Sequence, residues 1–341
     1  ASDVYKRQKY ESKILVRSWF FRIFTLLAVV FLGFFNFAMM LMEDNFGLWF
    51  AKSVSSNIPY LNLLLLNTGQ AVVAVFLSSE FLKRDKKLDT SEVFYVRPLS
   101  NAEYVIGKIW GNLRVFLLLN LLVLAIVLAF NFMASGITVD WQAYGVYFLL
   151  ISLPTLIFII GLSIFLMLVL RNQALTFILL LGYIGLTLFY IQDKFYYLFD
   201  YMVYNLPLFK STIVGFSNLE LILNHRAIYF FAGLGFIFFT IFLFKRLPNA
   251  RRSHYPWLFL SFCMFLLMVT AGFRHVRSIL REGEMRALYT SINNKYVYEP
   301  KMAIDYYDIS VEQKSETIRS VVGMEGTALA ASEGFIFCLN P

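Results

Sequence analysis

The stretch "IFTLLAVVFLGFFNFAMMLM", residues 23–42, runs for twenty positions without a charged side chain. About twenty helical residues cover the roughly 30 Å hydrocarbon layer of a bilayer. The whole chain of 341 residues shares this bias, because its hydrophobic fraction is 59%, whereas soluble domains have about 45–50%. The sequence therefore predicts an all-α protein that crosses a membrane several times.

Seven segments are apolar enough to be transmembrane helices, although the sixth and seventh lie at the short end of the spanning range. They are residues 23–42, 58–79, 115–133, 144–170, 174–191, 228–244 and 257–273. We therefore expect six to seven spans. The fourth segment is overlong and contains Pro154 and Gly161, which predicts a tilted or kinked helix.

The distribution of Lys and Arg predicts the orientation. With the N-terminus in the cytosol, most cations before residue 253 lie in cytosolic segments, and the outer loops hold four: Lys52, Lys194, Lys210 and Arg226. Cationic loops are retained on the cytoplasmic side. Four arginines closely follow the last span, within residues 274–286, on what should be the outer side, but long C-terminal domains are exported largely regardless of charge. The net charge of +8 thus reflects topology in a lipid bilayer, and we expect no nucleic-acid partner.

The two ends of the chain differ from the apolar middle. The opening "ASDVYKRQ", residues 1–8, resembles the translation of a transposon tag from sequencing libraries. We therefore expect a non-native leader there and, with the abrupt ending "GFIFCLNP", a gene fragment. Residues 9–22 mix cations with Trp and Phe, which favours an amphipathic helix in the cytoplasmic interface.

Residues 302–339 alternate between apolar and polar side chains, the period of half-buried strands. We expect turns at their glycines, which are Gly323, Gly326 and Gly334. Residues 274–341 would thus begin an extracytoplasmic β domain that is incomplete.

One dense polar island interrupts the apolar segments: "KRDKKLDTSEVFYVRPLSNAEYVIGK", residues 83–108. Ser100 and Glu103 form the pattern of a capping box, which predicts a helix start, and Asp89 with Glu92 is a looser version of it. Pro98 cannot continue a helix. The island therefore predicts a short helix over 90–96, a break, and a second helix that runs into the third span. The short helix exposes apolar and aromatic residues among charges, so we expect it to bind a protein partner.

The island resembles the cytoplasmic loop of ABC type-2 transporter permeases. In that family an acidic residue and a basic cluster close the second span, a short coupling helix follows, and a Pro-Ser-type turn leads to a Tyr and a Gly-Lys that open the third span. The matching framework here is Glu80, Pro98, Ser100, Glu103, Tyr104, Gly107 and Lys108. Three further stretches are similar to the family: "LPTLIFIIGLS" (153–163), "RNQALTF" (171–177) and "FDYMVYNLPLFKSTIVGF" (199–216), the last lying where the family has partly inserted elements.

The resemblance implies a permease domain over 23–250 in a bacterial inner membrane, with residues 251–273 as an additional span that most members lack. Two such subunits, identical or homologous, would form a translocation path. Each coupling helix would dock on a separate cytosolic ABC ATPase, which would bind the ATP and Mg. The residues expected at that contact are Leu88, Asp89, Glu92, Val93, Phe94, Tyr95 and Arg97.

The chain itself is not expected to be an enzyme or to bind a cofactor or metal. A phosphate-binding loop needs G-x-x-x-x-G-K-[ST], but Ala102 occupies the first glycine position before Gly107 and Ile109 follows the lysine. The zinc-binding pattern H-E-x-x-H is missing too, because the histidines are isolated: His225, His254 and His275.

Polar residues inside the predicted spans are the candidates for a substrate path: Asn36, Asn62, Asn67, Gln70 and Asn120. Asn67 and Gln70 are three residues apart and share a helix face. Interhelical hydrogen bonds explain such residues without transport. No Asp or Glu lies deep in a predicted span, which argues against an ion-coupled secondary carrier.

Two alternatives to an ABC permease remain open. "NNKYVYEP" (293–300), "YDISVEQ" (307–313) and "FCLNP" (337–341) resemble bacterial permeases whose gene continues into an aminopeptidase-like outer domain. The spans could then serve as a membrane anchor for a zinc enzyme whose catalytic part lies beyond residue 341. The other alternative is an ion-coupled secondary carrier.

Overall fold

The computed structural model describes most of the chain, with gaps between the helices. The described residues are 2–41, 54–79, 100–133, 138–206, 208, 210, 211, 215, 216, 218–244, 255–297, 302–314 and 317–329. They belong to two compact units, one of residues 1–210 with 218–275 and one of the remaining residues.

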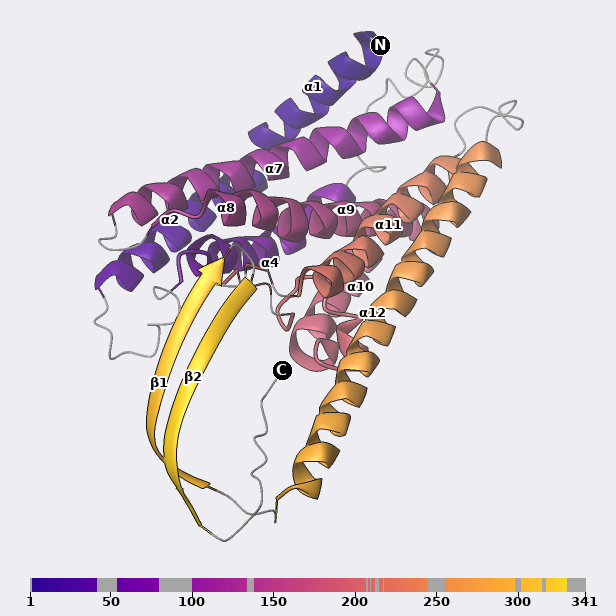
Figure 1. Ribbon diagram of the computed structural model, residues 1–341. Helices are drawn as coiled ribbons and strands as arrows, with labels where there is room; N and C mark the ends of the chain where they lie inside the picture. Colours follow the sequence, from indigo (N-terminus) through magenta and orange to yellow (C-terminus); the bar gives the residue numbers. More distant parts are fainter. Residues whose placement is uncertain are drawn as a thin grey trace. The chain divides into compact units, whose positions relative to one another are not determined.

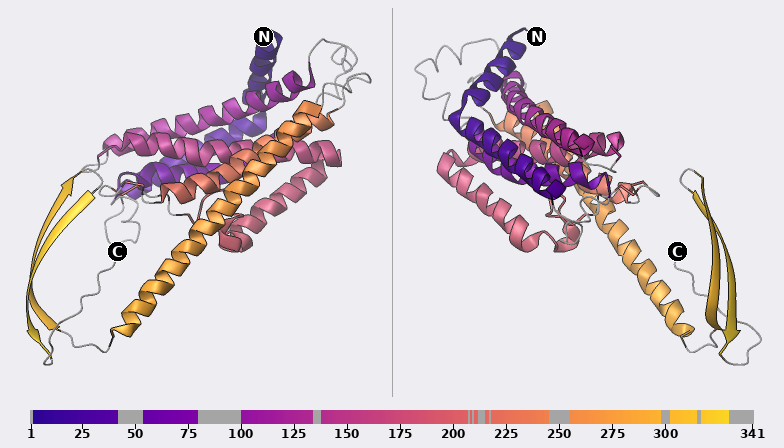
Figure 2. Two further views of the ribbon diagram at one scale, coloured as in Figure 1. Left: turned by 45° about the vertical axis from the view of Figure 1, so that its right-hand side comes forward. Right: turned by 90° about the vertical axis from the view of Figure 1, so that its left-hand side faces the viewer.

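The first unit is a bundle of helices (Figures 1 and 2). Its helices are α1 (Ser2–Arg17), α2 (Trp19–Leu41), α4 (Asn57–Ser79), α7 (Asn101–Met133), α8 (Trp141–Tyr147), α9 (Leu153–Leu170), α10 (Gln173–Leu186), α11 (Leu219–Leu243) and the first part of α12 (Tyr255–Lys295). Two π-helical turns, η1 (Phe148–Ser152) and η2 (Thr187–Ile191), continue α8 and α10, and a 3-10 turn, η3 (Phe195–Tyr197), follows.

Seven helical segments in the described part of the chain have the length and apolar composition of a membrane span. They are α2, α4, α7, α8–η1–α9, α10–η2, α11 and α12. Each of the seven predicted spans corresponds to one of them, which confirms a multi-pass helical membrane protein as far as length and composition can show.

α7 is one unbroken helix of 33 residues, as expected of a helix that begins in the island and runs into the third span. Two other helices differ from their predicted bounds. α11 starts nine residues before the predicted span, so Arg226 was wrongly assigned to an outer loop: it lies inside the helix and is 2% exposed. α12 continues to Lys295, well past residue 273, where we expected the span to end.

The centre of the bundle is formed by α4 and by α8–η1–α9, which are the most buried of the seven segments. α11 packs along α9 through two glycines. A Cβ added to Gly233 would lie 2.7 Å from the backbone of Ile157, and one added to Gly161 would lie 2.7 Å from the Gly233 carbonyl oxygen. Only hydrogen fits at these positions, so the two helix backbones lie in direct contact.

The fourth span contains the irregularity that Pro154 predicted. Proline has no N–H, so the carbonyl of Leu150 loses its helical partner. The structure places the π-helical turn η1 directly before α9, which begins one residue ahead of Pro154. Such turns are rare, and they leave backbone groups open to side chains of other helices.

In the second unit, β1 (Met302–Lys314) and β2 (Thr317–Ala328) form an antiparallel pair (Figure 1). Strands were therefore predicted correctly for this part of the chain. The predicted turns at Gly323 and Gly326 are wrong, because both glycines lie within β2, where they pair with Asp308 and Ile304. Glycine marks a turn only when the backbone needs a conformation that other residues avoid, and here the strand is extended.

Candidate functional site

The residues expected to contact an ATPase lie outside the part of the chain that the structure describes. They are Leu88, Asp89, Glu92, Val93, Phe94, Tyr95 and Arg97, and the framework residues Glu80 and Pro98 lie there too. Their roles stay predictions. The described chain resumes at Ser100, and from this point the framework residues can be located.

The predicted capping box is present at the start of α7. The Ser100 N–H donates to Glu103 Oε2 at 2.8 Å, and the Glu103 N–H donates to Ser100 Oγ at 3.1 Å. These reciprocal bonds satisfy backbone donors that a helix start leaves open. The last part of the polar island, from Ser100 on, therefore forms the capped start of α7.

The first turn of α7 is fixed to the end of α11. The ring of Tyr104, which is 2% exposed, stacks on Phe244 with ring centroids 5.0 Å apart. Beside it, Asn101 Nδ2 donates to the Phe244 carbonyl oxygen at 2.6 Å. Tyr104 thus joins two helices, a role that the resemblance did not indicate.

Lys108 and Gly107 are buried in the next turn, where α7 meets α1. Lys108 Nζ lies 3.9 Å from Glu11 Oε1, and their side chains are 1% and 3% exposed. Ser12 Oγ donates to the Gly111 carbonyl oxygen at 2.9 Å, and a Cβ on Gly111 would lie 2.7 Å from Glu11 Cβ. The helix predicted in the interface is therefore docked on α7, and Figure 1 shows the two side by side.

Three candidates for the substrate path come together in a closed ring of hydrogen bonds. Gln70 Nε2 donates to Asn67 Oδ1 (2.5 Å), and Asn67 Nδ2 donates to Ser152 Oγ (3.1 Å). Ser152 Oγ donates to Asn120 Oδ1 (2.7 Å), and Asn120 Nδ2 returns to Gln70 Oε1 (2.8 Å). All four side chains are 0% exposed. The polar ring, as we call these four residues, joins α4, α7 and η1.

The other two candidates pair with each other. Asn36 Nδ2 donates to Asn62 Oδ1 at 2.7 Å, and Asn62 Nδ2 donates back to Asn36 Oδ1 at 3.0 Å, linking α2 to α4. In this conformation none of the five predicted residues is more than 3% exposed. A transported molecule would not reach them without a change in packing, so the geometry favours interhelical bonding over substrate contact.

Sequence reasoning missed the role of Arg226 in α11, whose side chain donates four hydrogen bonds. Its Nε donates to the Leu150 carbonyl oxygen (2.6 Å), which is the oxygen that Pro154 leaves without a partner. Its Nη1 donates to the Tyr201 carbonyl oxygen and its Nη2 to Thr155 Oγ1, both at 2.8 Å. The guanidinium thus holds α11, the broken fourth span and the segment after η3 together. The sequence signal for this role was the position of an arginine close to a long apolar segment.

Asp200 was also missed; it lies in the connection before α11, outside the predicted spans. It is 3% exposed, and its two oxygens accept the backbone N–H groups of Tyr204 (3.0 Å) and Asn205 (2.8 Å). Burial raises the pKa of this carboxyl, while these hydrogen bonds and the charge of Arg226 act in the opposite direction. Tyr201, Met202 and Val203 beside it are 0–1% exposed, so this connecting segment packs inside the bundle.

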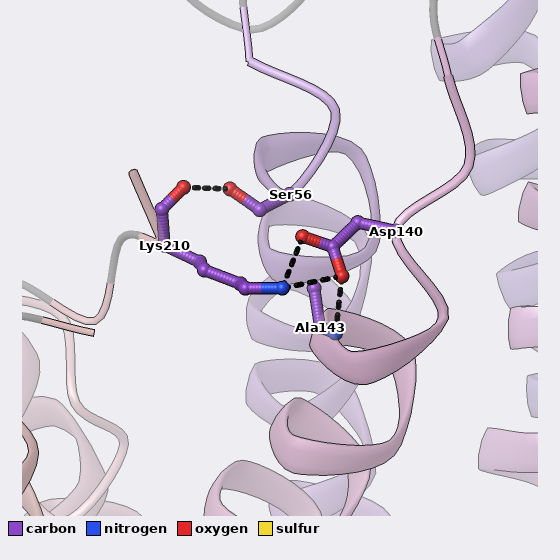
Figure 3. Close-up of polar contacts among 4 residues, drawn as sticks. All are labelled: Ser56, Asp140, Ala143 and Lys210. Carbon is purple, nitrogen blue, oxygen red and sulfur yellow. Dashed lines mark hydrogen bonds and ion pairs between the residues drawn. The ribbon is translucent and has the colours of Figure 1, made fainter. Parts of the chain in front are cut away.

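A polar clamp joins three connections between helices (Figure 3). Lys210 Nζ lies 2.8 Å from each oxygen of Asp140, and Asp140 Oδ1 also accepts the Ala143 N–H at the start of α8. Ser56 Oγ, just before α4, donates to the Lys210 carbonyl oxygen at 3.0 Å. Figure 3 shows these groups converging at the end of two helices.

Two histidines predicted to be isolated meet in the structure. The rings of His225 on α11 and His275 on α12 are 5.0 Å apart between centroids, and both side chains are 0% exposed. Their Nε2 atoms lie 3.0 Å and 2.9 Å from the carbonyl oxygens of Tyr197 and Tyr196. Within the described ranges, no cluster of three or more His, Cys, Asp or Glu side chains could hold a metal.

Comparisons with protein-family models, with curated proteins and with solved structures found no match to this chain.

Proposed function

We propose that this chain is the permease subunit of an ATP-driven exporter of the ABC type-2 class. It would lie in a bacterial inner membrane with its N-terminus in the cytosol and its last segment outside. A separate cytosolic ATPase would bind ATP and Mg, and a second permease subunit would complete the path. The proposal rests on the order of motifs around the island and on the helical arrangement.

The observation that carries the proposal is the continuity of α7. This helix begins inside the island, at the capping box of Ser100 and Glu103, and continues unbroken to Met133. At about 1.5 Å per residue, 33 residues span about 50 Å. A rigid helix of this length would carry a displacement of the island across the membrane, which is the task of a coupling element.

Contacts along α7 show where such a displacement would act. Tyr104 holds the end of α11, Lys108 holds α1, and Asn120 belongs to the polar ring. From Ser100 to Asn120 the helix rises about 30 Å. Movement of the cytosolic end would therefore carry α1 along and change the packing of α7 against α4, η1 and α11.

One observation favours an ion-coupled carrier instead, namely the buried carboxyl of Asp200. A proton or sodium relay needs a carboxylate that can exchange its partner, but both oxygens of Asp200 accept backbone N–H groups of its own turn. This geometry favours a structural role. Transport that depends on an ion gradient and is lost in Asp200→Asn would support the carrier, and transport that needs ATP would oppose it.

The test of the proposal is association with an ATPase encoded beside this gene. Phe94→Asp places a charge on the predicted contact and should abolish co-purification, whereas Ser91→Asp adds the same charge to the same short segment outside the predicted contact set and should retain it. Folding of each variant is checked by the elution of the detergent-solubilised protein. Undiminished association of the Phe94 variant, or labelling of position 94 from outside intact cells, would contradict the assignment.

A further inference from the structure

The two faces of α1 have opposite character. Glu11 and Leu15, four residues apart, are 3% and 4% exposed and face α7. Lys9, Lys13 and Arg17 follow one another at the same spacing and are exposed. Residues four apart share a helix face, and Lys13 is about half a turn from Glu11 around the axis. The three cations therefore form a ridge on the side of α1 that faces away from the bundle.

The position of this ridge relative to the first span is closely fixed. A single residue, Ser18, separates α1 from α2, and its N–H bonds to the carbonyl oxygens of Ile14 (2.9 Å) and Leu15 (3.0 Å). Arg22 Nε then donates back to the Val16 carbonyl oxygen at 3.0 Å. α1 therefore leads directly into the apolar helix α2, and these hydrogen bonds restrict its orientation relative to α2.

The residues at the junction are typical of a membrane–water boundary. Trp19 is 72% exposed and Phe20 is 42% exposed, and only Ser18 separates them from Arg17, the last cation of the ridge. Tryptophan is enriched at the level of the lipid headgroups. Because Arg17 is two residues from Trp19, we place the ridge at the height of the headgroups.

The charge of the ridge is not cancelled by its own helix. The nearest acidic residue, Glu11, points to Lys108 on the opposite side. Cations at headgroup height that no acidic residue of their own helix pairs with attract anionic lipids. Each cation close to the surface enriches these lipids locally by roughly fivefold. A docking site for a cytosolic protein would instead be expected to project beyond the headgroups.

We propose that the Lys9–Lys13–Arg17 ridge of α1 binds the headgroups of anionic phospholipids. The buried contact of Glu11 with Lys108 and the bond from Ser12 to Gly111 fix the rotation of α1, so the ridge is presented outward as a preformed surface. Bound headgroups would then help to hold the N-terminal half of α7 at one height. This inference goes beyond the proposed function, because it requires only that the chain spans a bilayer.

The experiment uses the full chain in lipid nanodiscs, with both cysteines replaced by serine and a fluorophore on Val16→Cys, which is beside the ridge and 49% exposed in the native residue. Fluorescence is quenched by spin-labelled phosphatidylglycerol or by spin-labelled phosphatidylcholine at the same fraction. The ratio of the two measures local enrichment of the anionic lipid. We expect a ratio several-fold above one that falls at high salt, because salt screens exposed charges.

The triple variant Lys9→Gln, Lys13→Gln, Arg17→Gln should bring this ratio close to one. A matched variant, Arg277→Gln, Arg281→Gln, Arg286→Gln, removes three exposed cations from α12 and should leave it unchanged. A ratio near one in the unmodified ridge, or an unchanged ratio in the ridge variant, overturns the proposal. Loss of fluorophore quenching by either lipid on adding a cytosolic ATPase would also overturn it, since the ridge would then face protein.

Discussion

Replacement of Asn120 by leucine is the most informative test of the bundle interior. Leucine has a similar size but no polar group, so it removes the bond from Asn120 to Gln70 and the bond from Ser152 to Asn120 without leaving a large void. Interhelical hydrogen bonds in membrane proteins are worth about 0.6 kcal/mol on average and about 1.7 at most. Two such bonds predict a loss of about 1 to 3 kcal/mol in the free energy of unfolding.

The closed form of the polar ring makes a second, sharper prediction. Ser152→Ala removes the same bond to Asn120. The loss of this bond is therefore counted in each single variant, but it occurs only once in the double variant Asn120→Leu, Ser152→Ala. The loss in the free energy of unfolding of the double variant should therefore be smaller than the sum of the two single losses, by about 0.5 to 1.7 kcal/mol. Unfolding in mixed detergent micelles, followed by tryptophan fluorescence, measures all three variants against the parent.

Asn131→Leu is the matched control on the same helix. Its amide makes one long bond, 3.3 Å to the Tyr144 hydroxyl oxygen, and its Oδ1 has no partner among the described residues. The free energy of unfolding should fall in this variant by well under half of its fall in Asn120→Leu. Equal losses, or strict additivity of the Asn120 and Ser152 variants, would refute the ring as a cooperative unit. Lost transport with unchanged stability would instead place these residues on a substrate route.

Three further predictions concern other contacts of the bundle. Gly233→Ala should destabilise the fold by about 1 to 3 kcal/mol, because its Cβ meets α9 backbone, whereas Gly182→Ala, with nothing within 4 Å, should be neutral or stabilising in the same micelle assay. Arg226→Lys should cost about 1 to 3 kcal/mol, because one ammonium group cannot serve acceptors on three segments; unchanged thermal stability would contradict this. Asp140→Asn keeps a capping oxygen but loses the charge, so a double-mutant cycle with Lys210→Met should give a coupling below about 1 kcal/mol that high salt removes.

The spans could be predicted because their signal is local. Twenty apolar residues must form a helix in lipid, since every backbone group has to be satisfied within the segment. The same rule does not predict where a helix ends once it has left the hydrocarbon layer. α12 therefore continued to Lys295 unnoticed, because the polar residues beyond Phe273 carry no hydropathy signal. The capping box was predictable for the same reason as the spans, since its two members are three residues apart.

The interior contacts were only half predictable. Asn67, Gln70 and Asn120 stand out as amides in apolar segments, but Ser152 does not, since a serine in a span can bond to its own helix. Which of them meet depends on the rotation and height of helices 32 to 85 positions apart in the sequence. Arg226 was misplaced because a cation was counted as a loop marker, although here backbone carbonyls of a broken helix satisfy it.

The contacts of α7 also limit how the proposed exporter can move. The N-terminal third of α7 carries Gly107 and Gly111, which would be weak points in an isolated helix. In the structure Gly111 is covered by Glu11 of α1, and Lys108 between the glycines is fixed to the same residue, so bending there would break a buried ion pair. Removing one partner of such a pair costs several kcal/mol, whereas tilting α1 and α7 together breaks neither contact. In the proposed exporter, the less costly motion would therefore be a rigid tilt of α1 and α7 together. This tilt would shift Asn120 against α4 and η1 and change the hydrogen bonds of the polar ring.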